Sequence, residues 1–273
     1  MPTRAVEICR DADALAATAA ELVIGAARAA VQARGRFTLV LSGGSTPEKT
    51  YSVLARAERL ATIDWSKVFV FFGDERYVPP GDPASNSGMA KRSLLARVPI
   101  APSQVFRIPT EKSSPADSAI AYSRELGRFF EQAPDSASVP RFDLVLLGLG
   151  DDGHTASLFP GMPAVQVDDR WVTWSPPGVL PPPVDRVTMT LPLLNAAREI
   201  VFLVAGEKKA NVLREILEEN PAREKYPAAG IAPTGGSLTW LLDAAAASRL
   251  TLIHKKSPMP HSESGTGAQD SPY

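Results

Sequence analysis

A glycine-rich loop in the middle of the chain carries the residues best suited to proton transfer. The segment GLGDDGH (148–154) follows an apolar run and places an acidic pair just before His154. Asp152 lies two residues upstream of His154 and can hold one ring nitrogen, which leaves the other nitrogen free as a general base. A lone histidine is more often structural than catalytic. The acidic pair in a glycine loop nevertheless favours a catalytic His154 with Asp152 as its partner.

The same loop matches the G-x-G-x-x-G pattern of dinucleotide-binding folds. Asp151 and Asp152 would stand where that motif receives a pyrophosphate, and Pro160 and Gly161 interrupt the chain before a long helix could form. We therefore expect no dinucleotide at this loop.

A second glycine turn, LSGGSTPE (41–48), also follows an apolar run. Gly43 and Gly44 allow the backbone to approach a ligand closely, and either Ser45 or Thr46 is expected to cap the helix that follows. Free N–H groups at that helix start would bind an anion such as phosphate. No Walker lysine is present, so this is not a nucleoside-triphosphate loop. An ordinary strand–helix turn explains the local residues about equally well.

Charged residues at a third strand end complete the set. Asp74 and Arg76 come directly after an apolar run and, at i and i+2, could point into one cleft. A solvated turn is the commoner explanation for such charges. The downstream SNS (85–87) could cap a helix or contact a hydroxylated ligand. Arg186 and Lys209 each lie beside another apolar run, and an arginine with a lysine commonly holds a phosphate.

The elements that must position these residues alternate between apolar runs and helical patterns. Helices are expected over 11–34, 47–60, 89–98, 116–132, 208–220 and 238–250, the first of them N-capped by Asp11 or Asp13 and stopped by Gly35. Strands are expected over 37–41, 67–72, 142–150, 187–191, 199–206 and 251–254. A proline-rich connection is expected over 172–185. This order predicts an α/β fold, Rossmann-like, with a mostly parallel central sheet and helices on both faces. We expect one domain over 1–255 and a disordered tail over 256–273.

Composition narrows the class of protein. Lys+Arg is 29 and Asp+Glu is 30, so the net charge of −1 argues against nucleic acid or an anionic membrane as partner. No apolar stretch is expected to reach the roughly 20 residues of a membrane span, and no export signal is visible. The one cysteine, Cys9, rules out an intrachain disulfide and a cysteine-rich zinc site. We expect a soluble, cytoplasmic protein, monomeric or weakly homo-oligomeric.

Two enzyme classes are disfavoured by missing motifs. The chain has no G-x-S-x-G elbow of the usual serine hydrolase, and no H-x-x-x-H pair for a histidine-rich metal site. We expect no metal, although the sequence leaves a carboxylate-bound Mg²⁺ open.

Seven segments in order carry a family resemblance over residues 37–250. They are LSGGSTPEKTY (41–51), FFGDERYVP (71–79), SNSGMA (85–90), FDLVLLGLGDDGHTASLFPG (142–161), DRVTMTLPLLNAA (185–197), VAGEKKA (204–210) and YPAAGIAPTGGSLTWLLDAAAA (226–247). Together they resemble the 6-phosphogluconolactonase family, within a group that includes the glucosamine-6-phosphate deaminases. The deaminases carry IAFNE after the histidine where this chain has TASLFPG (155–161), and they lack Arg76. Both departures favour the lactonases.

The resemblance implies hydrolysis of 6-phospho-D-glucono-1,5-lactone in the oxidative pentose phosphate pathway, without a metal or organic cofactor. His154 would activate water, and Gly43, Gly44, Ser45, Thr46, Arg186 and Lys209 would hold the 6-phosphate. Asp152 would orient the imidazole. Arg76 would serve either the oxyanion or the sugar, and Asp74 would bond ring hydroxyls or Arg76. Two other functions stay open at this point: an aminosugar-phosphate deaminase or isomerase, and a non-catalytic sugar-phosphate sensor.

Overall fold

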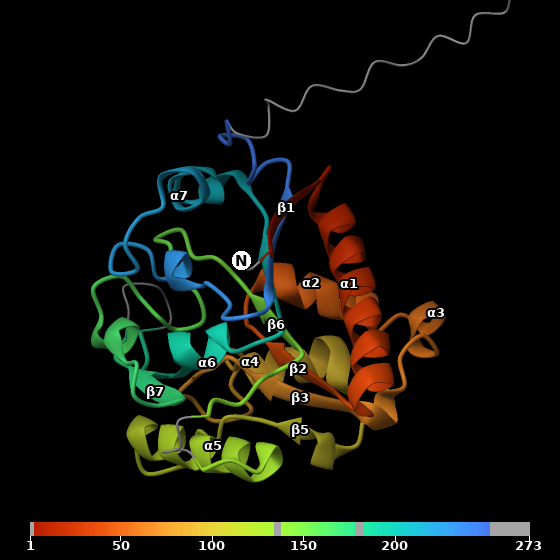
Figure 1. Cartoon of the computed structure of the whole chain (residues 1–273). Helices are drawn as coiled ribbons and strands as arrows, with labels where there is room; N and C mark the ends of the chain where they lie inside the picture. The colour runs from red at the N-terminus through yellow and green to blue at the C-terminus, as the bar shows by residue number, and fades with distance from the viewer. Residues whose placement is uncertain (1–2, 134–137, 178–182, 252–273) are drawn as a thin grey trace, which may run out of the picture.

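A seven-stranded parallel sheet, here called the main sheet, forms the centre of the computed structural model (Figure 1). The structure describes residues 3–133, 138–177 and 183–251. In spatial order the strands are β1 (Thr3–Cys9), β10 (Ser237–Asp243), β9 (Glu199–Val204), β6 (Leu144–Leu147), β2 (Phe37–Leu41), β3 (Val68–Phe72) and β5 (Val105–Phe106). Each neighbouring pair runs parallel, and β2, β6 and β10 are apolar and largely buried, as strands covered on both faces must be. The predicted α/β class with a mostly parallel sheet is confirmed.

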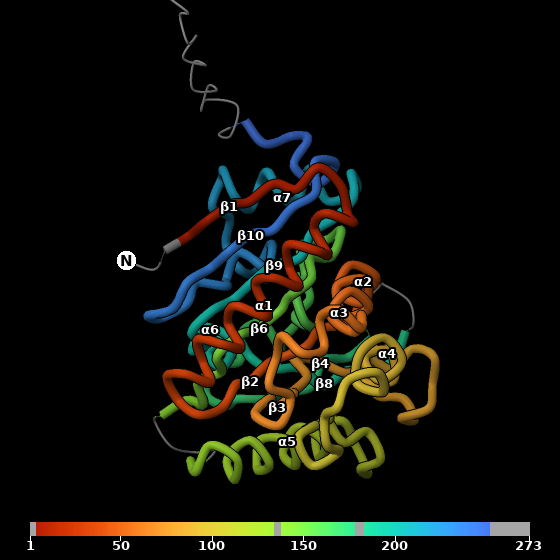
Figure 2. The backbone as a smooth tube through the Cα atoms, turned by 90° about the vertical axis from the view of Figure 1, so that its right-hand side faces the viewer, coloured from red at the N-terminus to blue at the C-terminus, as the bar shows by residue number. Residues whose placement is uncertain are grey.

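Helices cover both faces of the main sheet. They are α1 (Ala12–Arg34), α2 (Ser45–Leu54), α3 (Ala57–Leu60), α4 (Asn86–Ala90), α5 (Pro115–Phe130), α6 (Leu191–Asn195) and α7 (Ala210–Arg214), with a π turn after α4 (Lys91–Leu95) and another after α7 (Glu215–Glu219). Figure 1 shows α1 and α2 on one side of the sheet and α6 and α7 on the other, and in Figure 2 α1 crosses in front of the strands. The helix expected over 47–60 is therefore two helices.

A three-stranded antiparallel sheet, here called the small sheet, lies beside the main one. Its order is β4 (Asp74–Arg76), β8 (Arg186–Met189) and β7 (Val172–Ser175). Residues 74–76 form a strand where a loop is the expectation, and residues 172–175 form a strand where a proline-rich connection is the expectation, so both predictions are wrong. Strands of three and four residues carry too little alternation to be recognised from sequence.

The direction in which successive strands are added to the main sheet reverses between β2 and β6. From β2 the connections run outward through β3 to β5, and from β6 they run the other way through β9 to β10. In open α/β sheets a ligand site is expected beyond the carboxyl ends of the strands at such a reversal. The loops after β2 and β6 are the two glycine-rich segments found in the sequence.

Helix α1 confirms one prediction and corrects another. Asp11 caps its start by accepting a hydrogen bond from Ala14 N at 2.8 Å, and Gly35 ends it with φ 72°. At 23 residues, with a mean hydropathy of 1.5 in its most apolar window, α1 is long and apolar enough to span a membrane, contrary to the prediction. Half of that window is buried, and α1 packs against α2, β1, β2 and β10. Its packing is that of a core helix.

The end of the chain differs most from the sequence-based prediction. Residues 237–243 form β10, and the alanines after it form turns, where a helix over 238–250 had been predicted. Short apolar runs do not distinguish strand from helix, and the alanine run weighted the prediction toward helix. Residues 237–243 form a strand because they pair with β1 on one side and with β9 on the other. Of the strand predicted over 251–254, Thr251 lies in a bend, and residues 252–254 lie outside the described residues, as does the predicted tail. At the other end of the chain, β1 was not predicted.

Candidate active site

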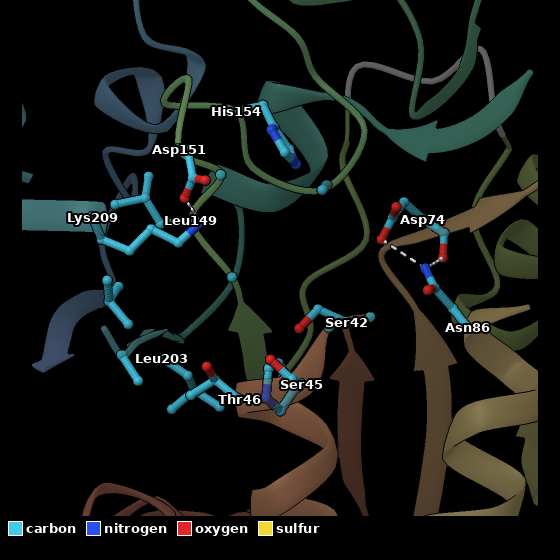
Figure 3. A pocket seen from close by; sticks show the side chains of 18 of the residues that line it. Ser42, Ser45, Thr46, Asp74, Asn86, Leu149, Asp151, His154, Leu203 and Lys209 are labelled. Carbon is cyan, nitrogen blue, oxygen red and sulfur yellow. Dashed lines mark hydrogen bonds and ion pairs between the residues drawn. The ribbon is translucent and has the colours of Figure 1, made fainter. Parts of the chain in front are cut away.

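One cavity of about 250 Å³ lies at the carboxyl ends of β2, β3, β6 and β9 (Figure 3). Nine of the predicted site residues line it: Gly43, Gly44, Ser45, Thr46, Asp74, Arg76, His154, Arg186 and Lys209. The tenth, Asp152, lies behind His154 and bonds to it. Four strand ends thus bring together residues that are up to 166 positions apart in the sequence, from Gly43 to Lys209.

The imidazole of His154 is held by Asp152 in the orientation expected. Nδ1 of His154 lies 2.6 Å from Oδ1 of Asp152, and the same oxygen accepts the His154 backbone N–H at 3.1 Å. Burial alone would raise the pKa of Asp152, but the hydrogen bond and charge of His154, helped by backbone amides, lower it overall. An ionised Asp152 accepts a hydrogen bond from Nδ1–H of His154, so Nε2 of His154 is left as the basic nitrogen.

Gly150 makes room for this pair. A Cβ at position 150 would lie 2.0 Å from Nδ1 of His154 and 2.6 Å from Oδ1 of Asp152. Any side chain there would push the imidazole away from its carboxylate. The ring of Phe159 packs against the imidazole with centroids 4.7 Å apart, which fixes its other side.

The glycine turn after β2 faces His154 across the cavity, with Ser45 and Thr46 on the opposite wall (Figure 3). The N-cap of α2 is Gly44, which has no side chain to accept a bond, so the predictions that Ser45 or Thr46 caps this helix are wrong. Without a side-chain cap, the first N–H groups of α2 keep their bonding capacity for a ligand. The carbonyl of Gly44 accepts from Glu48 N at 3.0 Å.

Buried side chains fix the backbone of this turn from behind. The Tyr51 hydroxyl accepts from Ser42 N and donates to Ser42 O, both at 2.9 Å, and Tyr51 is fully buried. At Gly43, a Cβ would lie 2.0 Å from Oδ1 of Asn86, so only glycine fits between β2 and α4. The glycine turn therefore has a defined position before any ligand arrives.

Two arginines lie directly opposite each other in the small sheet. Arg76 of β4 pairs with Arg186 of β8, so their side chains leave the same face of the ladder. Arg186 is 4 % exposed, and burial is the main reason why its pKa is lowered; nearby Asp74 opposes this shift, and Arg76 adds a smaller lowering. Its guanidinium lies 5.2 Å from the ring centre of Phe159. Two arginines that line one cavity are suited to bind an anion.

Asp74 and Arg76 are held by neighbours on α4 and in the histidine loop. Asp74 accepts from Ser157 Oγ at 2.6 Å and from Asn86 Nδ2 at 3.2 Å. Arg76 donates from Nη1 to the carbonyl of Ala84 at 2.7 Å, and its buried Nε has no hydrogen-bond partner among the described residues. Arg76 lines the cavity and thus keeps unused donor capacity there.

Glu75 holds the segment that carries Asn86. It is 1 % exposed and accepts from the backbone N–H groups of Asn86 at 2.6 Å and Ser87 at 2.8 Å. The hydrogen bonds lower the pKa of Glu75, but burial has the larger effect and raises it overall. Ser85 caps α4 by accepting from Gly88 N at 3.0 Å, which confirms one of the two uses predicted for the serine–asparagine–serine segment.

Lys209 lies at the start of α7, on the opposite side of the cavity from Asp74 (Figure 3). Its ammonium group forms an ion pair with Asp151, the residue next to Asp152. The two acidic residues of the histidine loop thus have different partners, one at the imidazole and one at the lysine.

Several residues that shape the site were not singled out from sequence. Asp151 was considered only as an obstacle to a dinucleotide, and Tyr51, Phe159 and Ser157 were given no role. Tyr51 and Phe159 stand within the segments that carry the resemblance, but their partners Ser42 and His154 are contacts that only the folded chain reveals. Asn86 was named only as part of a capping or hydroxyl-binding segment.

Metal ligands do not gather at this cavity. Within residues 3–133, 138–177 and 183–251, no group of three or more His, Cys, Asp or Glu side chains is arranged to hold a metal ion. The absence of a metal and of an organic cofactor stays a prediction.

Comparisons with known proteins agree on one family. Residues 10–240 match the family model of glucosamine-6-phosphate isomerases/6-phosphogluconolactonase. A 6-phosphogluconolactonase of a Nostoc species is 42% identical over 91% of this chain and 99% of its own, and that of Rattus norvegicus is 42% identical over 89% and 92%. The solved 6-phosphogluconolactonase from Trypanosoma cruzi superposes with a TM-score of 0.80 at 31% identity, over 92% of this chain and 97% of its own. The chain belongs to the glucosamine-6-phosphate isomerase/6-phosphogluconolactonase family.

Proposed function

We propose that this protein hydrolyses 6-phospho-D-glucono-1,5-lactone to 6-phospho-D-gluconate. The observation that carries the proposal is the Asp152–His154 pair, whose imidazole faces an uncapped helix start across one cavity that Arg186 and Lys209 also line. A base at one wall and an anion site at the other fit a substrate with an ester at one end and a phosphate at the other. The names of the matched relatives support the same reaction.

The proposed chemistry needs one general base and one water molecule. Nε2 of His154 takes a proton from water as its oxygen attacks C1 of the lactone, and a tetrahedral intermediate forms. When the bond between C1 and the ring oxygen breaks, the imidazolium returns the proton to that oxygen. Asp152, kept ionised by its lowered pKa, stabilises the imidazolium between the two steps.

The phosphate end supplies binding energy away from the reacting carbon. Backbone N–H groups of Gly43–Thr46, together with Arg186 and Lys209, are proposed to hold the 6-phosphate, which fixes the ring at reacting distance from His154. Arg76 is opposite Arg186 and is proposed to contact the C1 oxyanion or the ring hydroxyls; Asp74 keeps that part of the site in place through Ser157 and Asn86.

The imidazole activates the water in this scheme, so no metal and no organic cofactor are included. Lactone hydrolysis that is unchanged after dialysis against a chelator is the expected result. We further propose that the enzyme acts in the cytoplasm, in the oxidative pentose phosphate pathway.

The decisive experiment compares wild type with His154→Ala. Lactone consumption is followed above the spontaneous rate, and we expect kcat to fall about 10²–10⁴-fold with a small change in KM, which is the usual contribution of a general base. Arg170→Ala is the matched control, since Arg170 is exposed and pairs with Asp169 outside the cavity. Near wild-type turnover in His154→Ala would remove the base assignment. Release of ammonia from glucosamine 6-phosphate, without lactone hydrolysis, would establish the deaminase alternative.

A further inference from the structure

The acidic residue at the phosphate end of the cavity is the starting point. Asp151 lines the cavity and forms an ion pair with Lys209, the lysine proposed above to hold the 6-phosphate (Figure 3). Gly43–Thr46, Arg186 and Lys209 all favour an anion, whereas a carboxylate beside them opposes one. A site shaped only to bind phosphate as tightly as possible would not place a negative charge there.

The exposure of the two partners shows which one is free to move. The Asp151 side chain is 52 % exposed, whereas that of Lys209 is 23 % exposed. Asp151 belongs to a surface turn, and its carboxylate can rotate into solvent at little loss of packing. Lys209 begins α7 and stays at the cavity wall.

We propose that Asp151 is an internal competitor of the substrate phosphate for Lys209, and that it sets how tightly phosphorylated ligands are held. This inference rests on the proposed function, because it uses Lys209 as a phosphate contact. When a phosphorylated ligand binds, Lys209 exchanges the carboxylate for a phosphoryl oxygen, so its net contribution is smaller than that of a lysine without a partner. The displaced carboxylate remains near a dianion and weakens binding further.

Such competition acts on product as well as substrate. The product 6-phosphogluconate carries the same phosphoryl group and a new carboxylate, so an overly tight phosphate site would retain it. Interactions that hold substrate and product alike do not lower the barrier of the chemical step. A weakened phosphate site therefore favours product release without removing any group that acts on C1.

Competition by Asp151 should affect phosphorylated ligands and leave unphosphorylated ones unchanged. A ligand without a phosphoryl group leaves the Asp151–Lys209 pair intact, so its affinity does not depend on Asp151. The effect of residue 151 is thus expected only for ligands that reach Lys209 with a negative charge.

The test is Asp151→Asn, which keeps the shape of the side chain and removes its charge. Dissociation constants for 6-phosphogluconate, inorganic phosphate and gluconate are measured by calorimetry on the full chain. We expect the first two constants to fall about two- to fivefold, the size of an exposed ion pair, and the gluconate constant to stay the same. Asp169→Asn is the matched control: Asp169 is an exposed aspartate paired with Arg170 outside the cavity, and its variant should bind all three ligands like wild type.

A second variant separates competition from simple repulsion. In a Lys209→Ala background, Asp151→Asn should lose most of its effect on 6-phosphogluconate binding, because the lysine for which the carboxylate competes is gone. An unchanged or weaker affinity in Asp151→Asn, or a full effect without Lys209, would overturn the proposal. If wild type neither hydrolyses the lactone nor binds 6-phosphogluconate, the proposed function itself fails, and with it this inference.

Discussion

Buried charge is held differently at the amino ends of the main-sheet strands, here called the amino edge, and at their carboxyl ends with the adjoining small sheet, here called the carboxyl edge. At the amino edge, Asp143 is 6 % exposed, and its carboxylate accepts from Arg34, from the Thr38 backbone and from the Thr38 hydroxyl, each at 2.8 Å. At the carboxyl edge, Arg76 and Arg186 are directly opposed, and Arg76 Nε has no hydrogen-bond partner in the described part of the chain. Asp143 therefore has its partners within the chain, whereas Arg76 keeps a donor nitrogen that a ligand could complete.

The largest effect is expected on the free energy of unfolding, from a substitution at the amino edge. Asp143→Ala removes the acceptor of Arg34 and of both Thr38 groups, and the ion-pair partner of Arg198. The two arginines are 36 % and 38 % exposed, so the main loss comes from the two buried Thr38 donors, each of which typically lowers the free energy of unfolding by about 1–3 kcal/mol when left without an acceptor. Chemical denaturation should show that loss, while kcat of the folded fraction stays near wild type. A variant that keeps its stability but loses activity would reverse the comparison.

The second-largest effect is expected on KM, from a substitution at the carboxyl edge. Arg186→Ala removes the charge-assisted phosphate contact that we propose for this buried arginine. Such a contact is worth about 1.5–3 kcal/mol, which corresponds to roughly a 10- to 150-fold rise in KM for the phosphorylated lactone. Steady-state kinetics should show the rise in KM with a much smaller change in kcat. The loss of unfolding free energy should be smaller than for Asp143→Ala. A large fall in kcat at constant KM would instead assign Arg186 to the reacting carbon.

Tyr51 sharpens the comparison, because it stabilises the carboxyl edge from outside the cavity. Tyr51→Phe leaves the buried N–H and C=O of Ser42 without their described partner, which typically lowers the free energy of unfolding by about 1–3 kcal/mol. Denaturant melts give the loss directly. Tyr51 does not line the cavity, so a second expectation is a modest rise in KM as the glycine turn loosens. An unaltered melt would show that the hydroxyl contributes nothing to this edge.

The smallest effect is the pH dependence of Asp152. Its pKa is lowered from the ordinary value of 3.8 in the folded protein, so its contribution to stability is fully present above that value and is lost as the pH falls through the lowered pKa. The difference in unfolding free energy between wild type and Asp152→Asn should shrink at the acid end of a pH series. A difference that grows as the pH drops below 3.8 would contradict the sign of this shift.

The sequence predicted the location of the site better than its internal contacts. Carboxyl ends of parallel strands meet at one edge of a sheet, and the loops singled out after three apolar runs do line one cavity. The Asp152–His154 contact is local, at i and i+2, and was also predicted. The opposition of Arg76 and Arg186 depends on the register of a small sheet between segments 110 residues apart, a feature that no local pattern encodes.

The errors have the same physical origin. β10 was taken for a helix because an alanine run follows it, and only burial between two other strands decides its conformation. The N-cap of α2 was expected at a serine or threonine, the usual preference, but Gly44 occupies it. At that position the ordinary preference was set aside, which is expected where a ligand and a side-chain cap would compete for the same N–H groups.

The burial of Arg186 also has a consequence for thermal stability. Arg186 is 4 % exposed, and burial is the main reason why its pKa is lowered. A bound anion offsets the cost of holding a cation away from water, so a sugar phosphate is expected to stabilise the architecture as well as to react. The enzyme should then melt at a higher temperature when saturated with its product than when alone, and the gain should be smaller when Arg186 is replaced.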